Sequence, residues 1–278
     1  MKKMKTSIAL LFSVIVILAA ISPALAETPQ PSMRPRELTD SNSSSYNWAG
    51  YAVSDPAGLV TYVSGSWIVP SVSGSKKTTA YSAFWVGIDG LTPDSPTVEQ
   101  IGTDSDIQNG RAVYYAWYEF YPKQFVQIIT GFSISPGDTI FSSVSYSSNI
   151  FTLTITDTTN GNSKTITQDA STLGYSVKLN SAEWIAEAPS SFQGILPLAN
   201  FGTVKYGQDY TSVSSTCSAT INGVTSPIGS FTSSGYQTYQ IDMIGTTRHG
   251  RTTTTYTKAS TSDLTPDGTS FSVSWLNA

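Results

Sequence analysis

The chain has 278 residues, with 15 Lys or Arg, 19 Asp or Glu and one His, and its formal net charge is −4 at pH 7. An acidic balance without a Lys/Arg cluster argues against nucleic acid as a partner. The one cysteine, Cys217, permits no intramolecular disulfide, and together with the one histidine, His249, it cannot supply the several ligands of a zinc site. We expect no metal and no cofactor.

The first 26 residues have the pattern of a secretory signal peptide. A basic start with three lysines precedes an apolar run over residues 8–21, and residues 24–26, Ala-Leu-Ala, form a small-x-small cleavage site. The run is shorter than the roughly 20 residues that span a bilayer. We therefore expect a secreted, extracellular protein that keeps no membrane attachment after cleavage.

Residues 27–45 are rich in Pro, Ser and charge and have no periodic apolar pattern. They are predicted to be a linker or a short pro-segment. For a pro-segment, the hypothesis is that self-cleavage at low pH releases it. From residue 46 to residue 278 the chain consists of short Val, Ile, Thr, Tyr, Phe and Trp stretches separated by Gly, Pro, Asn and Asp. This part is expected to be a single β-domain.

The alternation of apolar and polar residues predicts fourteen strands and no helix of any length. In chain order they cover residues 47–53, 62–68, 82–88, 97–103, 113–121, 125–129, 139–147, 150–157, 164–167, 182–186, 200–206, 239–243, 253–258 and 271–275. Turn signals separate several of them, among them Asn109-Gly110, Asn160-Gly161 and Asn222-Gly223. So many strand edges favour an all-β, antiparallel two-sheet β-sandwich of the lectin-like jelly-roll type.

Residues 181–189, SAEWIAEAP, read as a strand suited to burial that nevertheless carries two carboxylates, Glu183 and Glu187, on one face. The same two-residue period gives other central strands a face with aromatic and polar groups: Trp85, Gly87 and Asp89; Val98, Gln100 and Gly102; Tyr115, Trp117, Glu119 and Tyr121. If these faces line one side of a sheet, they form a concave groove, the usual form of a binding site.

Other kinds of site fit the sequence less well. His249 lies between Arg248 and Arg251, which disfavour an imidazolium and so a Ser-His-Asp triad or a Cys217–His249 pair. Neither Asp-Thr-Gly nor Asp-Ser-Gly, the triplets of pepsin-like enzymes, occurs in the chain. Residues 104–110, DSDIQNG, depart from the spacing of a calcium loop, and we interpret them as a polar hairpin turn.

Seven ordered motifs between residues 47 and 206 resemble those of the glutamic peptidases, family G1 or eqolisins. They are NWAG (47–50), GSWIVPSV (65–72), FWVGIDG (84–90), QIG (100–102), AWYEFYP (116–122), EWIAE (183–187) and NFGTV (200–204). The residues after 206 match this pattern poorly.

The resemblance implies a two-sheet sandwich that binds an extended polypeptide substrate on its concave face and acts as a secreted, acid-acting endopeptidase. It assigns Gln100 as the catalytic glutamine and Glu187 as the catalytic glutamate. Trp85, Asp89 and Glu119 become supporting residues, with Tyr115 and Trp117 on the same face. Tyr115 stands where the family usually has Asp. No cofactor is implied, and we expect a monomer.

This pair has a chemical rationale: an ionised Glu187 activates water and returns the proton to the departing nitrogen, while Gln100 donates an N–H to the oxyanion. An amide keeps its charge state between acid and neutral pH, which suits an acid-acting site. Two alternatives stay open on the residues alone. The groove could bind carbohydrate as a non-catalytic lectin-like module, or Glu119 and Glu187 could form the carboxylate pair of a glycosidase.

Overall fold

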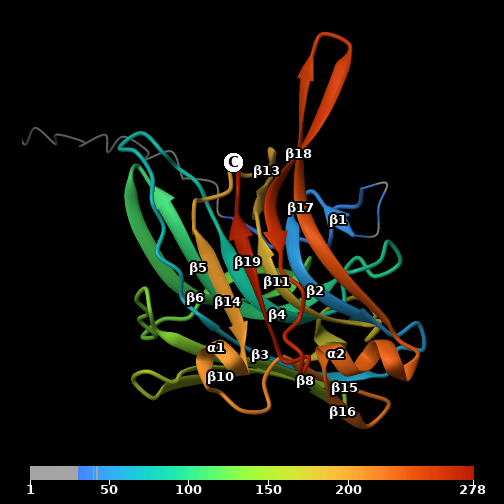
Figure 1. Ribbon diagram of the computed structural model, residues 1–278. Helices are drawn as coiled ribbons and strands as arrows, with labels where there is room; N and C mark the ends of the chain where they lie inside the picture. The colour runs from blue at the N-terminus through green and yellow to red at the C-terminus, as the bar shows by residue number, and fades with distance from the viewer. Residues whose placement is uncertain (1–30, 40, 42) are drawn as a thin grey trace, which may run out of the picture.

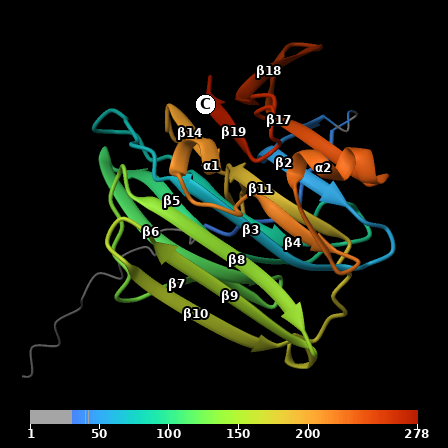
Figure 2. The same ribbon diagram turned by 60° about the horizontal axis from the view of Figure 1, so that its bottom comes forward.

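The computed structural model describes residues 31–39, 41 and 43–278, which form two packed layers of mainly antiparallel strands (Figures 1 and 2). We call the layer that carries the predicted site the site sheet. Its strands, in spatial order, are β7 (Gln124–Ile128), β6 (Arg111–Tyr121), β5 (Val98–Gln108), β4 (Ala83–Ile88), β11 (Ser181–Glu187), β2 (Trp48–Ser54) and the first part of β17 (Gln237–His249).

The second layer, the back sheet, contains three strands from the middle of the chain, β8, β9 and β10, side by side (Figure 2). Its strands are β10 (Asn162–Asp169), β9 (Ile150–Asp157), β8 (Thr139–Ser147), β3 (Val60–Ile68), β15 (Ser218–Ile221), β16 (Val224–Pro227), β14 (Thr203–Gly207), β19 (Ser270–Trp275) and β18 (Thr252–Thr261). The two-sheet sandwich predicted from the sequence is confirmed.

Strand β17 belongs to both layers. Its residues up to Ile241 pair with β2, and from Met243 onward it pairs with β18. Beyond the sandwich, β17 and β18 continue as a hairpin that projects away from the body (Figure 1), and its tip, residues 246–255, is exposed. His249 lies on this tip, in agreement with its exclusion from the site.

The remaining elements are short. They are β1 (Ser44–Ser45), β12 (Ser190–Ser191), β13 (Gly194–Ile195), the helices α1 (Gln208–Thr211) and α2 (Ile228–Phe231), and the 3₁₀ turns η1 (Ala170–Thr172) and η2 (Thr232–Ser234). Among the residues that the structure describes, no helix has the length and apolar character needed to cross a membrane. The predicted signal peptide lies outside these residues.

Most expected turns form where the Asn-Gly pairs stand. Asn109 and Gly110 both have positive φ (52° and 75°), as do Asn222 and Gly223 (52° and 77°), the backbone that tight hairpins require. The prediction for residues 104–110 was wrong in extent, since β5 continues to Gln108 and only the Asn-Gly pair turns. Strands β15 and β16 were missed, although the turn between them was predicted.

The sandwich has a hydrophobic cluster on each side of the site sheet. On β11, Trp184 points between the layers, where its Nε1 donates to the Ser64 carbonyl at 2.7 Å, while Ile185 points to the outer face. The outer cluster contains Trp48, Ala83, Trp85, Val98, Trp117, Ile185 and Met33. The alternation explains how strands that are buried on both faces can still present a functional surface.

Candidate active site

Three rows of side chains cross the outer face of the site sheet, because the register sets residues of β11, β4, β5 and β6 directly opposite one another. The first row holds Glu183, Gly87, Gln100 and Glu119; the middle row holds Ile185, Trp85, Gly102 and Trp117; the third holds Glu187, Ala83, Asp104 and Tyr115. The rows therefore bring Gln100 and Glu119 side by side and set Glu187 across the sheet from them.

Glycine keeps the middle of this face open for the Trp85 ring. A Cβ at Gly87 would lie 2.9 Å from Cζ3 of Trp85 and 3.1 Å from Cβ of Gln100, and one at Gly102 would lie 2.6 Å from Cβ of Trp85. Both distances at Gly87 are shorter than normal carbon contacts. The indole of Trp85 thus extends across the face from the Gln100 row to Glu187.

Glu187 is held at the end of β11 by two side-chain donors, one on β4 and one just before β2. Trp85 Nε1 donates to its Oε2 at 3.0 Å, and Asn47 Nδ2 donates to its Oε1 at 3.4 Å. The side chain is fully buried. Burial raises the pKa of Glu187 well above its usual range, and the nearby Glu119 carboxylate adds to this, while its hydrogen-bond donors oppose it.

Gln100 and Glu119 form a cross-strand pair. Gln100 Nε2 donates to Glu119 Oε2 at 3.0 Å, which leaves Oε1 of Gln100 without a hydrogen-bond partner among the described residues. Burial raises the pKa of Glu119 to about 8, against the effect of the donors that surround it. The pair gives the site one fixed amide whose oxygen remains able to accept a hydrogen bond.

The N-terminal residues 32–34 lie across this face. Met33 N donates to Glu119 Oε2 at 3.0 Å, and Gln100 Nε2 makes a longer contact of 3.4 Å with the Met33 carbonyl oxygen. The next amide, Arg34 N, donates to Glu187 Oε1 at 2.9 Å. Ser32 Oγ donates to Glu119 Oε1 at 2.9 Å. The sequence motifs did not indicate that residues 32–34 would lie on this face.

Tyr115 takes part in a separate carboxylate cluster at the far end of the third row. Its hydroxyl contacts Asp104 Oδ2 at 2.7 Å and Asp106 Oδ2 at 3.2 Å. Burial raises the pKa of Asp104 well above its usual range and that of Asp106 to about 7. The two aspartates share the face of Gln100 by strand alternation, a signal that was lost when residues 104–110 were taken for a turn.

Asp89 was expected to share the face of Trp85, but it does not. Strand β4 ends at Ile88, and Asp89 has a positive φ of 73°, so the two-residue alternation stops there. Its carboxylate accepts hydrogen bonds from the backbone N–H groups of Lys178, Leu179 and Asn180 at 2.8 to 2.9 Å. Asp89 therefore holds the loop that leads into β11, the strand that carries Glu187.

Trp117 lies in the middle row, fully buried in the outer cluster beside Trp85. Two residues that the sequence did not point to, Asn47 and Trp48, also contact residues 34 and 35: Trp48 Nε1 donates to the Arg34 carbonyl at 3.0 Å, and Asn47 Nδ2 donates to the Pro35 carbonyl at 3.2 Å. Both belong to the NWAG motif, which was noted for its resemblance and not for a role. Asn47 directly precedes β2, and Trp48 begins it opposite Glu187, which places both beside residues 32–34.

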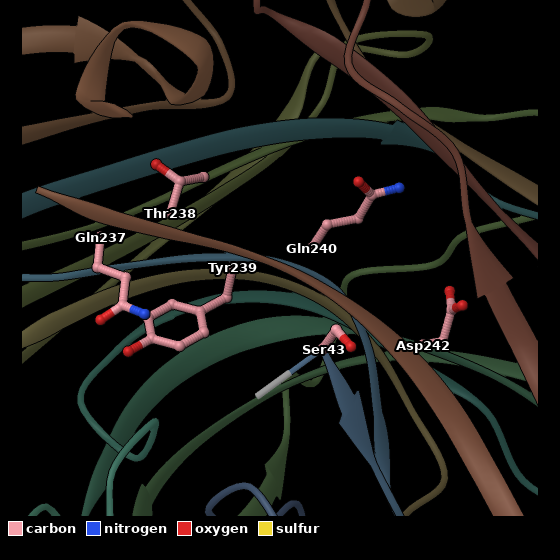
Figure 3. A pocket seen from close by; sticks show the side chains of 6 residues that line it. All are labelled: Ser43, Gln237, Thr238, Tyr239, Gln240 and Asp242. Carbon is pink, nitrogen blue, oxygen red and sulfur yellow. The ribbon is translucent and has the colours of Figure 1, made fainter. Parts of the chain in front are cut away.

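A hollow of about 360 Å³ on the edge of the molecule lies away from these groups. Its lining comes from β17 and the residue before β1, with Gln237 and Thr238 at one end and Asp242 at the other (Figure 3). Asp242 is the only carboxylate among its lining residues, and the Thr261 N–H already donates to it at 2.7 Å. Its lining contains none of the paired groups of the outer face.

The chain is similar to known proteins in sequence and in fold. Aspergillopepsin-2 of Aspergillus niger is 32% identical over 187 residues, a match that covers 60% of this chain and 64% of the relative, so the chain spans slightly less than two thirds of that protein. The structure of scytalido-glutamic peptidase with a peptide based transition state analog has a TM-score of 0.61 and 26% identity over 83% of this chain and 98% of that one.

Aspergilloglutamic peptidase from Aspergillus niger is also similar, with a TM-score of 0.53 and 25% identity over 71% of this chain and 99% of that one. A model of the Peptidase A4 family matches residues 46–265, which is most of the chain. The chain therefore belongs to the Peptidase A4 family, in agreement with the resemblance to glutamic peptidases that its motifs carry.

Proposed function

We propose that the protein is an endopeptidase that hydrolyses polypeptides with Gln100 and Glu187 as its catalytic pair. The observation that supports this most directly is that one peptide bond, between Met33 and Arg34, lies between them. Its carbonyl oxygen is 3.4 Å from Gln100 Nε2 and its nitrogen is 2.9 Å from Glu187 Oε1. A donor at the carbonyl and a proton carrier at the nitrogen are the groups that amide hydrolysis requires.

The reaction follows from these positions. Ionised Glu187 takes a proton from water, whose oxygen attacks the carbonyl carbon, and Gln100 Nε2 donates to the oxyanion that forms. Glu187 then delivers the proton to the nitrogen, the C–N bond breaks, and a carboxylic acid and an amine leave. An oxyanion donor of this kind contributes about 10²- to 10³-fold in rate.

Neighbouring groups keep the pair in place. Glu119 accepts a hydrogen bond from Gln100 Nε2 and so orients the amide with its nitrogen toward the substrate carbonyl. Trp85 and Asn47 donate to Glu187 and favour its ionised form. The amide N–H of the bound peptide, here Arg34 N, donates to the same carboxylate and favours its ionised form further, against the effect of burial.

Acid action is part of the proposal because the fold itself favours acid. Burial raises the pKa of Asp89, Glu99, Asp104, Asp106, Glu119, Glu183 and Glu187. The folded chain therefore binds protons more tightly than the unfolded chain, and protonation stabilises it. With the leader pattern of the first 26 residues, this supports an enzyme that works outside the cell in an acidic medium.

The test is product analysis. Acid-treated protein is incubated with a denatured, unfolded polypeptide at about pH 4, and new amino termini are identified by mass spectrometry. We expect internal cleavage by the parent and none by Glu187→Gln, whose folding is checked by circular dichroism. Cleavage that persists in Glu187→Gln would contradict the assignment of the base.

A parallel incubation with oligosaccharides addresses the two carbohydrate alternatives. Binding or cleavage of a sugar, with the polypeptide left intact, would replace the peptidase by a lectin-like module or a glycosidase. Neither alternative needs an amide donor at Gln100, whereas hydrolysis of a peptide bond does.

A further inference from the structure

We propose that Phe125 and Phe192 are specificity-determining residues: together they bind a large apolar side chain of a polypeptide substrate, two residues before the bond that is cut. This rests on the proposed peptidase function and names the class of polypeptide sequence that the site prefers. Neither phenylalanine belongs to the seven motifs of the sequence or to the three rows of the site sheet.

Both side chains are exposed, although phenylalanine is usually buried. Phe125, on the edge strand β7, is 57% exposed, and Phe192, in the turn between β12 and β13, is 82% exposed. The two residues come from distant parts of the chain, and the fold brings them to one place. Apolar side chains that gather on the surface beside a groove mark a binding site for an apolar group.

The two phenylalanines line one hollow of about 260 Å³, which we call the Phe125–Phe192 hollow. Its other lining residues are Pro31, Ser32, Arg34 and Ser191. Pockets that hold a whole small molecule have volumes of about 300 Å³ or more. The hollow is smaller than this, and it suits a single side chain of a longer ligand.

The hollow adjoins the bond that lies between the catalytic groups. Ser32 and Ser190 exchange both backbone hydrogen bonds, at 2.9 and 2.8 Å, so this part of the chain binds as an added strand. Alternate side chains of such a strand point to one side, and Ser32 and Arg34 both line the hollow. Ser32 lies two residues before Arg34 N, the nitrogen that donates to Glu187. A substrate in this register places its corresponding side chain beside the hollow.

The residues found at these positions do not cover the two rings. The Ser32 side chain is short, and its Oγ donates to Glu119 Oε1 at 2.9 Å. Arg34 Nη2 donates to the Ser191 carbonyl at 2.8 Å, which directs this side chain to the backbone of β12. A longer apolar side chain at the position of Ser32 would enter the hollow.

The two walls differ in how they are held. Phe125 packs edge-on against Tyr121, with ring centroids 6.2 Å apart, so its ring is fixed before a ligand binds. Phe192 has no ring contact with another aromatic side chain among the described residues. Its contacts would come from the bound side chain, and we expect Phe192 to contribute at least as much selectivity as Phe125.

The walls supplied by the sandwich select an apolar side chain. Apart from residues 31–34, the hollow is lined by Phe125, Ser191 and Phe192, and none of these is charged. A charged side chain would lose hydration there without gaining a partner, whereas an aromatic or large aliphatic one would cover both rings. The substrates are therefore polypeptides with Phe, Tyr, Trp or Leu two residues before the cleaved bond.

The experiment compares two internally quenched peptides that differ only at this position, one with Phe and one with Ala. All proteins carry Met33→Asp, which places a carboxylate in the apolar outer cluster, so that residues 32–34 leave the face. Mass spectrometry verifies that both peptides are cut at the same bond. At about pH 4 we expect kcat/KM to be about 10- to 100-fold higher for the Phe peptide, mainly through a lower KM.

Single substitutions test each wall. Phe192→Ala and Phe125→Ala should each lower the preference for the Phe peptide about three- to tenfold and leave kcat/KM of the Ala peptide nearly unchanged. Phe192→Leu keeps an apolar wall and should retain part of the preference. Val224→Ala removes a side chain that is 63% exposed on β16 of the back sheet, and the preference should stay the same.

The outcomes distinguish this inference from the peptidase assignment. Equal kcat/KM for the two peptides, or equal losses on both peptides in Phe192→Ala, would overturn the role of the hollow and leave the peptidase assignment standing. If a folded Met33→Asp protein cuts neither peptide, the peptidase assignment fails. Binding of the two uncut peptides to Met33→Asp with Glu187→Gln, measured by calorimetry, then still decides the inference: a tighter Kd for the Phe peptide supports it, and equal Kd values overturn it.

Discussion

Trp85 Nε1 donates a 3.0 Å hydrogen bond to Glu187 Oε2, which joins a tryptophan of the middle row to the proposed base. Trp85→Phe keeps most of the ring and removes this donor. Loss of a donor disfavours the ionised carboxylate, so we expect a further rise in the pKa of Glu187. The acid limb of the kcat profile should move to higher pH, and kcat near pH 4 should fall about tenfold.

The measurement is a pH–rate profile of the variant beside that of the parent. Trp48→Phe is a suitable comparison, because Trp48 packs edge-on against Trp85 at 5.0 Å but its Nε1 donates to the segment and not to Glu187. Its acid limb should stay in place. An unchanged limb in Trp85→Phe would show that this hydrogen bond does not tune the base.

Glu119 is predicted to position Gln100 rather than to react. Glu119→Ala leaves Gln100 Nε2 without its 3.0 Å acceptor, so the amide can rotate. We expect kcat to fall about 10- to 100-fold, within the range of a mispositioned oxyanion donor, with a smaller change in KM.

Glu119→Gln retains a carbonyl acceptor toward Gln100 and should recover part of the lost kcat. Steady-state kinetics on a short peptide check both variants. Equal losses in the two would mean that the charge of Glu119, and not its contact with Gln100, matters.

Stability should be higher in acid than near neutral pH. Burial raises the pKa of Asp106 to about 7 and of Glu119 to about 8, and it also raises the pKa of Glu183. For carboxyls whose folded pKa lies above the unfolded value of about 4, the stabilising protonation is complete below pH 4 and is lost as pH rises toward 8. The Tm of the inactive Glu187→Gln protein should therefore fall by several degrees between pH 4 and pH 8.

Glu183 offers the sharpest single test of this dependence. Its side chain is fully buried, and neither carboxylate oxygen has a hydrogen-bond partner among the described residues. In the Glu187→Gln background, Glu183→Gln should raise the unfolding free energy by about 1 to 3 kcal/mol at pH 8. It should change less at pH 4, where the raised pKa keeps Glu183 protonated in the fold and the unfolded chain is already partly protonated. A lower free energy of unfolding at pH 8 would mean that Glu183 is ionised and stabilised in the fold.

Tyr115 links Asp104 and Asp106 and is expected to matter for stability more than for turnover. Tyr115→Phe removes the donor to both carboxylates, so their ionised forms lose stabilisation. The unfolding free energy should fall by about 1 to 3 kcal/mol at pH 8 and by less at pH 4. Tyr118→Phe, on the same strand, changes a hydroxyl with no hydrogen bond to any described residue and serves as control. Urea titrations at the two pH values measure both variants.

Local sequence was sufficient for most strands and for the shared face of Trp85, Gln100, Glu119 and Glu187, because a two-residue period and Asn-Gly turns are short-range signals. It failed where backbone geometry breaks the period. Asp89 adopts a positive φ just after β4, and β5 runs past Asp104 and Asp106 because their burial and their contacts with Tyr115 offset their low strand propensity.

The position of the N-terminal segment could not be predicted locally at all. Arg34 and Glu187 are 153 residues apart in the chain, and Met33 and Glu119 are 86 apart. A Pro- and Ser-rich composition indicates lack of independent structure, but it does not indicate which surface the segment binds. Only the assembled face, with its buried hydrogen-bonding groups and its apolar centre, determines that.

The most direct test of the account is the kcat/KM of Met33→Asp alone and of Met33→Asp with Gln100→Ala on one fluorogenic peptide at pH 4. Met33→Asp places a carboxylate in the apolar outer cluster, so residues 32–34 leave the face in both proteins. The account predicts a loss of about 10²- to 10³-fold with unchanged circular dichroism, because the oxyanion loses its donor. A folded Gln100→Ala variant with undiminished kcat/KM would contradict it.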